Sequence, residues 1–209
     1  FEYIFWRIRG VNSFWPSAGI ISGLIIFLLA DPAAPIELAI GATFLAVVGK
    51  QFIRLANAHI FNPAAFGLLA AGFLGLPITW WGVSWGYLPL ALTILGAGYV
   101  SLFAIRQYKI VFSFLVVALV GSSLYIGHII PAINQMLVGA FWFFALVMLP
   151  EPMTAAKLSK IRIFYGSLIA LLPFTLSQLH FFPEPLLASL LVGNLAARIG
   201  DTKLNWGKE

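Results

Sequence analysis

The stretch Asn57-Ala58-His59-Ile60-Phe61-Asn62-Pro63-Ala64-Ala65-Phe66-Gly67 interrupts a long run of apolar sequence with helix pattern on both sides. A helix that ends before Asn62 leaves carbonyl groups without partners, and one that starts at Pro63 leaves free N–H groups. At membrane depth such backbone is tolerated only where it packs in protein or lines a cavity. The stretch therefore predicts a broken helix at or near a binding site. The alternative is an ordinary polar loop between two spans.

The composition places this stretch in an integral membrane protein. The chain is 61% hydrophobic and only 9% charged, whereas soluble domains are about 25% charged. Its apolar segments have the length of helices rather than the alternation of barrel strands. The sequence has no cysteine, which excludes disulfides, thiolate catalysis and an iron–sulfur cluster ligated by this chain.

Eight apolar segments predict an all-α bundle of about eight transmembrane helices, within a range of six to ten, with broken helices. We expect an interfacial segment over 1–15, a transmembrane domain over 16–199, and a cytoplasmic tail over 200–209 that leads to a further domain or ends the chain. The predicted spans are 16–30, 35–53, 63–77, 87–105, 110–127, 132–149, 163–179 and 185–198.

Charge predicts the orientation. If each segment crosses once, the basic residues all fall on one side and the other side carries only three acids: Asp31, Glu37 and Glu184. The positive-inside rule then puts both termini in the cytoplasm. The net charge of +5 is explained by this topology, so no nucleic-acid partner is expected.

A second interruption, Leu149-Pro150-Glu151-Pro152-Met153-Thr154, follows the sixth segment. Paired interruptions in two halves point to a site at the middle of repeat-built membrane proteins. With eight spans, however, both interruptions lie on the cytoplasmic side, which does not fit an inverted repeat of four plus four helices. Either the repeat has an odd number of helices or the two interruptions are not counterparts.

Two blocks of sequence resemble the NqrB/RnfD family. Gly49-Lys50-Gln51, followed by His59 to Ala64 and Gly67, is similar to the family's first-half pattern. Phe141 to Ala145, followed by Glu151 to Thr154, is similar to its second-half pattern. The proline-rich turn from Asp31 to Pro35 also fits, so that the resemblance covers roughly residues 15–170.

The resemblance implies a fold like that of urea transporters, with inverted repeats, in the bacterial inner membrane. Family members are subunits of ion-pumping, flavin-containing electron-transfer complexes, the sodium-translocating NADH:quinone reductase and Rnf. Typical members carry FMN covalently on a threonine. Here the corresponding stretch, Ser84-Trp85-Gly86-Tyr87-Leu88-Pro89-Leu90, has no threonine, so we predict no covalent FMN. The chain also resembles a reduced membrane domain that is joined to a ferredoxin-reductase-like FAD/NAD(P) module.

Three candidate cofactor-binding residues lie around the first interruption. Asn62 is predicted to hydrogen-bond the ring edge of a non-covalent flavin (FMN, FAD or riboflavin) or a quinone, or to cap the following helix. His59 either protonates a reduced cofactor or faces lipid or water at the interface. Lys50 either pairs with a phosphate or is an ordinary charge at a helix end.

Two more candidates lie in the second interruption. Glu151 binds a cation or relays protons, or forms salt bridges with its basic neighbours, which are Lys157, Lys160 and Arg162. Thr154 contacts a phosphate or caps the seventh span. Heme is not expected, because His128 and His180 offer only one pair, at the outer ends of two spans.

Three functions remain open from the sequence. The first is a membrane electron-transfer subunit, an oxidoreductase component that works with other subunits or with a fused FAD/NAD(P) module. The second is a channel or transporter for a small solute. The third is a structural subunit of a larger membrane complex. Whether the chain is itself an enzyme is left open.

Overall fold

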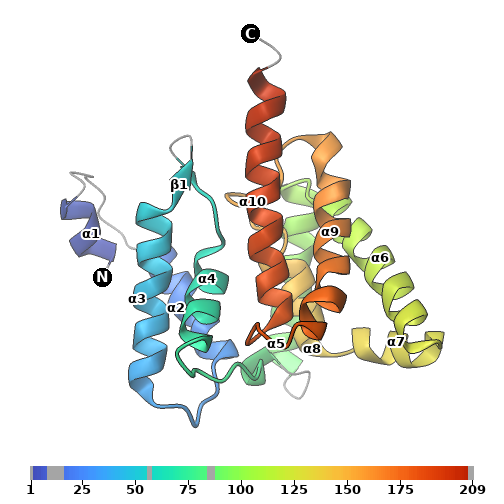
Figure 1. Ribbon diagram of the computed structural model, residues 1–209, viewed down its shortest axis with the longest axis horizontal. Helices are drawn as coiled ribbons and strands as arrows, with labels where there is room; N and C mark the ends of the chain where they lie inside the picture. The colour runs from blue at the N-terminus through green and yellow to red at the C-terminus, as the bar shows by residue number, and fades with distance from the viewer. Residues whose placement is uncertain (1, 9–16, 56–57, 84–87, 207–209) are drawn as a thin grey trace.

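The computed structural model describes residues 2–8, 17–55, 58–83 and 88–206, and these are almost entirely helical (Figure 1). The predicted all-α membrane fold is confirmed. The helices are α1 (Glu2–Ile8), α2 (Ser17–Leu29), α3 (Ile36–Phe52), α4 (Pro63–Gly72), α5 (Leu88–Tyr99), α6 (Tyr108–Ile126), α7 (Ile129–Met136), α8 (Gly139–Phe143), α9 (Ser159–Gln178) and α10 (Pro185–Trp206). The π-helical turns η2 (Val100–Ala104) and η3 (Phe144–Met148) extend α5 and α8, and η1 (Trp81–Val83) is a 3-10 turn.

Every predicted span corresponds to helix, but few of these helices are long enough to cross a membrane. Among the described residues, α6 and α9 meet the length and hydropathy expected of a span. The pair α7 and α8–η3 makes a third only if it is one span bent by 67°. The helices α2 and α4 are shorter, and α10 continues past the predicted end at 198 to Trp206.

The first interruption is more than a loop. After α3 the chain forms a short antiparallel hairpin of β1 (Arg54–Leu55) and β2 (Ala58–His59), in which Arg54 pairs with His59. The hairpin turns the chain back towards the bundle, so that α4 starts at Pro63 beside the end of α3. This geometry buries His59 and Asn62.

Small residues allow the central helices to approach closely. A Cβ on Gly67 of α4 would lie 2.2 Å from the Ala42 carbonyl oxygen and 2.8 Å from the Ala46 Cβ on α3. A Cβ on Gly166 of α9 would lie 2.3 Å from the Ile110 carbonyl oxygen on α6. Glycine at helix contacts is the usual way for membrane helices to pack through their backbones.

Two helical hairpins run in opposite directions. In Figure 1, α3 rises and α4 descends, whereas α9 descends and α10 rises. Each second helix opens with a polar residue and a proline, Asn62-Pro63 in α4 and Glu184-Pro185 in α10. The side-chain oxygens of Asn62 and Glu184 accept a hydrogen bond from the backbone N–H three residues further on.

The turns before these hairpins also match, since Asp31-Pro32 precedes α3 and Glu151-Pro152 precedes α9. Each hairpin is thus preceded by an acid–proline pair, and its second helix opens on a polar residue followed by proline. Which interruptions correspond in an inverted repeat stays a prediction.

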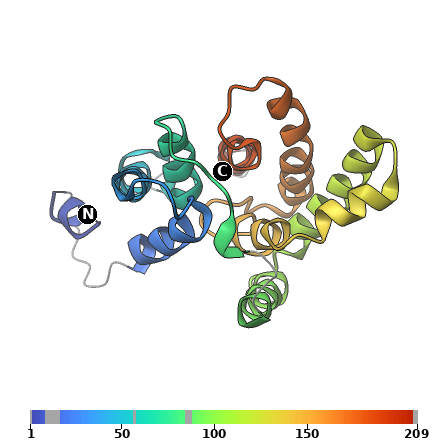
Figure 2. The same cartoon turned by 90° about the horizontal axis from the view of Figure 1, so that it is seen from below.

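Several basic segments of the described chain lie close to one another, at the end of α3, in β1, on α10 and before α6 and α9. Hydrogen bonds connect the segments that carry them, and the pairs are Arg198 with the Leu55 carbonyl, the Lys157 N–H with Asp201, and Arg162 with the Arg106 carbonyl. Figure 2 shows α1 to α4 on one side of the molecule and α6, α7, α9 and α10 on the other, with α8 near the middle.

We predict that Gly67→Ala lowers the free energy of unfolding by about 1–3 kcal/mol, because the new methyl group collides with the backbone of α3. Gly41→Ala is the matched control, since nothing lies within 4 Å of a Cβ there, and it is expected to be neutral or slightly stabilising. Thermal unfolding of both variants in detergent measures the difference. Equal melting curves for the two variants would contradict the close α3–α4 contact.

Candidate functional site

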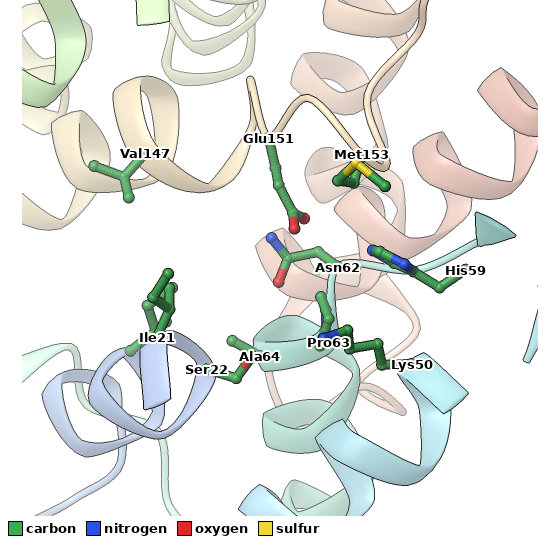
Figure 3. A pocket seen from close by; sticks show the side chains of 11 residues that line it. Ile21, Ser22, Lys50, His59, Asn62, Pro63, Ala64, Val147, Glu151 and Met153 are labelled. Carbon is green, nitrogen blue, oxygen red and sulfur yellow. The ribbon is translucent and has the colours of Figure 1, made fainter. Parts of the chain in front are cut away.

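A cavity of about 310 Å³ lies between the two interrupted segments, where the two halves of the molecule meet (Figure 3). It brings together four of the five predicted site residues: Lys50, His59, Asn62 and Glu151. The other lining residues are Ile21, Ser22, Ile25, Pro63, Ala64, Val147 and Met153. The cavity thus has a polar side and an apolar side, as binding sites for small molecules usually do.

Asn62 closes the interruption at the start of α4. Its Oδ1 accepts a hydrogen bond from the Ala65 N–H at 3.0 Å, so the predicted capping role is confirmed. Its side chain also hydrogen-bonds Glu151, and Figure 3 shows the two side chains pointing toward one another. Its backbone N–H donates to the Asn194 Oδ1 at 2.9 Å. The next residue, Pro63, has no N–H to satisfy.

Asn194 of α10 is a functional residue that the sequence reasoning missed. It is fully buried, and its Nδ2 donates to the Tyr165 hydroxyl at 2.8 Å and lies 3.4 Å from the Thr154 carbonyl oxygen. The Tyr165 hydroxyl in turn lies 3.4 Å from the Leu149 carbonyl oxygen. A lone asparagine inside an apolar span is the signal that points to such a role, because it must find partners in the bundle.

Glu151 and Thr154 act as a pair. The Thr154 hydroxyl donates to the Glu151 Oε2 at 2.8 Å. Thr154 therefore holds the Glu151 side chain in place and does not itself line the cavity. Glu151 lies in a connecting segment outside the spans. Burial raises the pKa of its carboxyl group, and the Thr154 hydrogen bond, the Lys50 charge and Asn62 offset part of this rise.

Two alternative roles predicted for this segment, salt bridges of Glu151 and helix capping by Thr154, are wrong. No ion pair joins Glu151 to Lys157, Lys160 or Arg162 in the described part of the chain. Thr154 does not cap the following helix, because α9 begins at Ser159. Asp201 of α10 reaches this helix start instead and accepts hydrogen bonds from the Lys157 and Leu158 N–H groups at 2.9 and 3.0 Å.

His59 is buried, with 6% of its surface exposed, so its predicted alternative position in lipid or water is wrong. Its Nε2 is buried and has no hydrogen-bond partner among the described residues. Burial lowers the pKa of His59 to about 4, and four cations, Lys50, Arg54, Arg198 and Lys157, act in the same direction. The ring is therefore neutral at pH 7. An unpaired buried nitrogen is costly, and a polar ligand atom in the cavity would pair with it.

Lys50 has a partner that the sequence did not reveal. Its Nζ forms a partly buried ion pair with the Glu2 carboxylate, whose other oxygen accepts a hydrogen bond from the Gly19 N–H at 2.7 Å. The helix α1 is thereby clamped to α2 and α3. Lys50 lines the cavity as half of an ion pair, in place of the free phosphate-binding charge or the plain helix-end charge that were predicted.

The stretch 84–90, which corresponds to the covalent-flavin pattern of the family, lies largely outside the residues that the structure describes. Residues 84–87 are outside the described residues, and of 88–90 only the backbone helix is described. That this stretch contains no threonine is known from the sequence alone.

These features define an all-α integral membrane protein with a polar cavity between its two interrupted segments. The sequence matches the family described as NQR2, RnfD, RnfE over residues 71–204, well over half of its length, and the chain belongs to this family. The match includes Glu151, Thr154 and Asn194, whereas Lys50, His59 and Asn62 precede it. No curated protein matches the chain. Membership makes the chain a membrane subunit of an NADH:quinone reductase or Rnf type of electron-transport complex.

We predict that Asn194→Ala lowers the free energy of unfolding by at least about 2 kcal/mol. It leaves the buried Asn62 N–H without its acceptor and removes the donor to the Tyr165 hydroxyl oxygen in an apolar interior. Asn134→Ala, at an exposed position of α7, is expected to change stability little. Thermal unfolding in detergent compares the two, and a mild effect at Asn194 would show that the hydrogen-bond network is dispensable.

The lowered pKa of His59 predicts a pH dependence of stability. Between pH 6.5 and about 4 the unfolded chain takes up a proton at this histidine that the folded chain does not, so stability falls as the pH is lowered through this window. His59→Gln removes this component and flattens the curve relative to wild type. Melting temperatures measured from pH 7 to 4 test it, with His180→Gln, an exposed histidine, as the control that keeps the wild-type slope.

Proposed function

We propose that this chain is an electron-transfer subunit that holds the ring of a flavin (FMN, FAD or riboflavin) or a quinone, without a covalent link, in the cavity between its two interrupted segments. The observation that supports this most directly is the buried, unpartnered Nε2 of His59 in the wall of a cavity whose other polar groups are Asn62 and Glu151. Family membership supports the electron-transport role.

The donor set suits a flat ring with polar edges. His59, Asn62 and Glu151 supply hydrogen-bonding groups on one side, and Ile21, Ile25, Val147 and Met153 supply apolar surface for ring faces. The volume of about 310 Å³ lies at the lower end of the range for ligand pockets. The ring portion would therefore fill the cavity, and any phosphate or isoprenoid tail would extend out of it.

Each wall residue has a distinct task in this proposal. A bound flavin or quinone supplies the chemistry of accepting and passing on electrons. His59 and Asn62 orient the ring by hydrogen bonds to its edge, and Glu151, whose pKa burial raises, exchanges a proton beside that edge. The ion pair of Lys50 with Glu2 neutralises the lysine and holds α1 against this wall of the cavity.

The partners follow from the same proposal. Electrons would reach or leave the ring through other subunits of a membrane complex or through a joined FAD/NAD(P) module. The basic end of the molecule, which carries the hairpin and both interruptions, would face the cytoplasm of a bacterial cell by the positive-inside rule. The site would then lie on the side where a soluble electron donor docks.

The proposal predicts that the protein purified from its host membrane carries flavin or quinone that denaturation releases. Absorbance spectra and mass spectrometry of the released fraction identify the ring, and the absence of flavin fluorescence from the denatured band tests for a covalent link. His59→Leu is expected to weaken ring binding about 5- to 10-fold, because it removes one buried hydrogen bond.

His180→Leu, exposed and outside the cavity, is the control that keeps the wild-type ring content. A folded protein that carries neither flavin nor quinone would contradict the proposal and leave a structural accessory subunit. Passage of a small solute through the reconstituted protein would instead favour a channel or transporter.

A further inference from the structure

A second groove, of about 390 Å³, lies between α6 and α9, away from the cavity described above. Its floor and sides are mainly apolar and include Phe112, Val116 and Ile163, and 69% of the Phe112 surface is exposed. The groove extends from Tyr108 and Lys109 to Val117, which is roughly 12 Å at 1.5 Å of rise per residue. In a membrane protein this surface faces lipid tails.

One end of the groove is positively charged. Lys109 lines it in the first turn of α6, and Lys160 lies three residues before Ile163 on α9, hence on the same face of that helix. The Lys109 Nζ donates to the Ser159 Oγ at 2.7 Å, which places the lysine between the starts of both helices. Arg106, which is exposed, lies two residues before the start of α6.

These charges are not neutralised within the described chain. Neither Lys109 nor Lys160 takes part in an ion pair among the described residues. Asp201, the acid that lies at the start of α9, already accepts two backbone hydrogen bonds there. The groove mouth therefore retains a positive charge at the basic end of the molecule.

We infer that this groove is a binding site for an anionic phospholipid. An apolar groove open to the bilayer fits an acyl chain, and the two lysines at its mouth are placed for a negatively charged headgroup. Basic pockets between membrane helices on the cytoplasmic side bind anionic headgroups in this way. A zwitterionic lipid would fill the same groove but would gain no net attraction at the mouth, and an apolar partner helix would leave the lysines unused.

The test uses the full chain in detergent, with phosphatidylglycerol and phosphatidylcholine of identical acyl chains as probes and native mass spectrometry as the measurement. We expect wild type to bind phosphatidylglycerol at least about tenfold more tightly. The double variant Lys109→Gln/Lys160→Gln is expected to lose roughly 10- to 30-fold in affinity for phosphatidylglycerol only, since each lysine near an anionic surface contributes on a similar scale. Lys203→Gln, an exposed lysine on α10 at the same end, is the matched control.

A second variant tests the groove separately from its charge. Ser167 lines the groove on α9, and Ser167→Phe fills it while both lysines stay, so binding of both lipids should fall. Circular dichroism checks that the helices remain, and if this variant fails to fold, the lysine variant alone decides. Equal binding of the two lipids, full binding by the lysine variant, or a co-purifying membrane helix that excludes lipid would each overturn the inference. Bound flavin or quinone is a separate readout, so failure here does not affect the proposed electron-transfer role.

Discussion

The structure depends on how an interrupted helix satisfies its backbone inside an apolar bundle. The chain between α3 and α4 exposes backbone polar groups that neither lipid nor an apolar interior can pair. Asn62 caps the helix that follows with its own side chain, and Asn194, on the last helix, accepts the Asn62 N–H. Asn194 also binds the Tyr165 hydroxyl and approaches the Thr154 carbonyl. The buried side chain of Asn194 thus joins the start of α4 to Tyr165 of α9 and to the segment before α9.

The cavity is a consequence of this solution. Where helices break, polar side chains must gather to pair the loose backbone, and the same side chains then make a polar wall. Asn62 and Glu151 contribute to both tasks, since they hold each other in place and face the cavity. His59 is the member whose ring nitrogen the fold leaves unpaired. Asn62 and Glu151 therefore support the structure, whereas the His59 ring nitrogen is available to bind a ligand.

Charge is arranged around the cavity rather than within it. Burial lowers the pKa of His59, and cations from α3, β1, α10 and the segment before α9 lower it further, so the ring is neutral. Lys50, the cation that lines the cavity, is paired with Glu2. The remaining basic residues collect at the same end, where they suit anionic lipid headgroups and the positive-inside rule. Positive charges around a neutral cavity stabilise electron-rich groups, and no unpaired charge has to be buried in the apolar core.

The sequence by itself determined the membrane class, the helical segments, the break before Pro63 and most of the cavity residues. These follow from local properties: apolar length, the missing N–H of proline, and polar residues where a helix cannot continue. Only the tertiary structure decided that Asn62 meets Asn194, 132 residues away, that Glu2 neutralises Lys50, and that Asp201 rather than Thr154 serves the start of α9. Such pairings arise from how helices pack against one another, and nothing in the local pattern of either partner encodes the other.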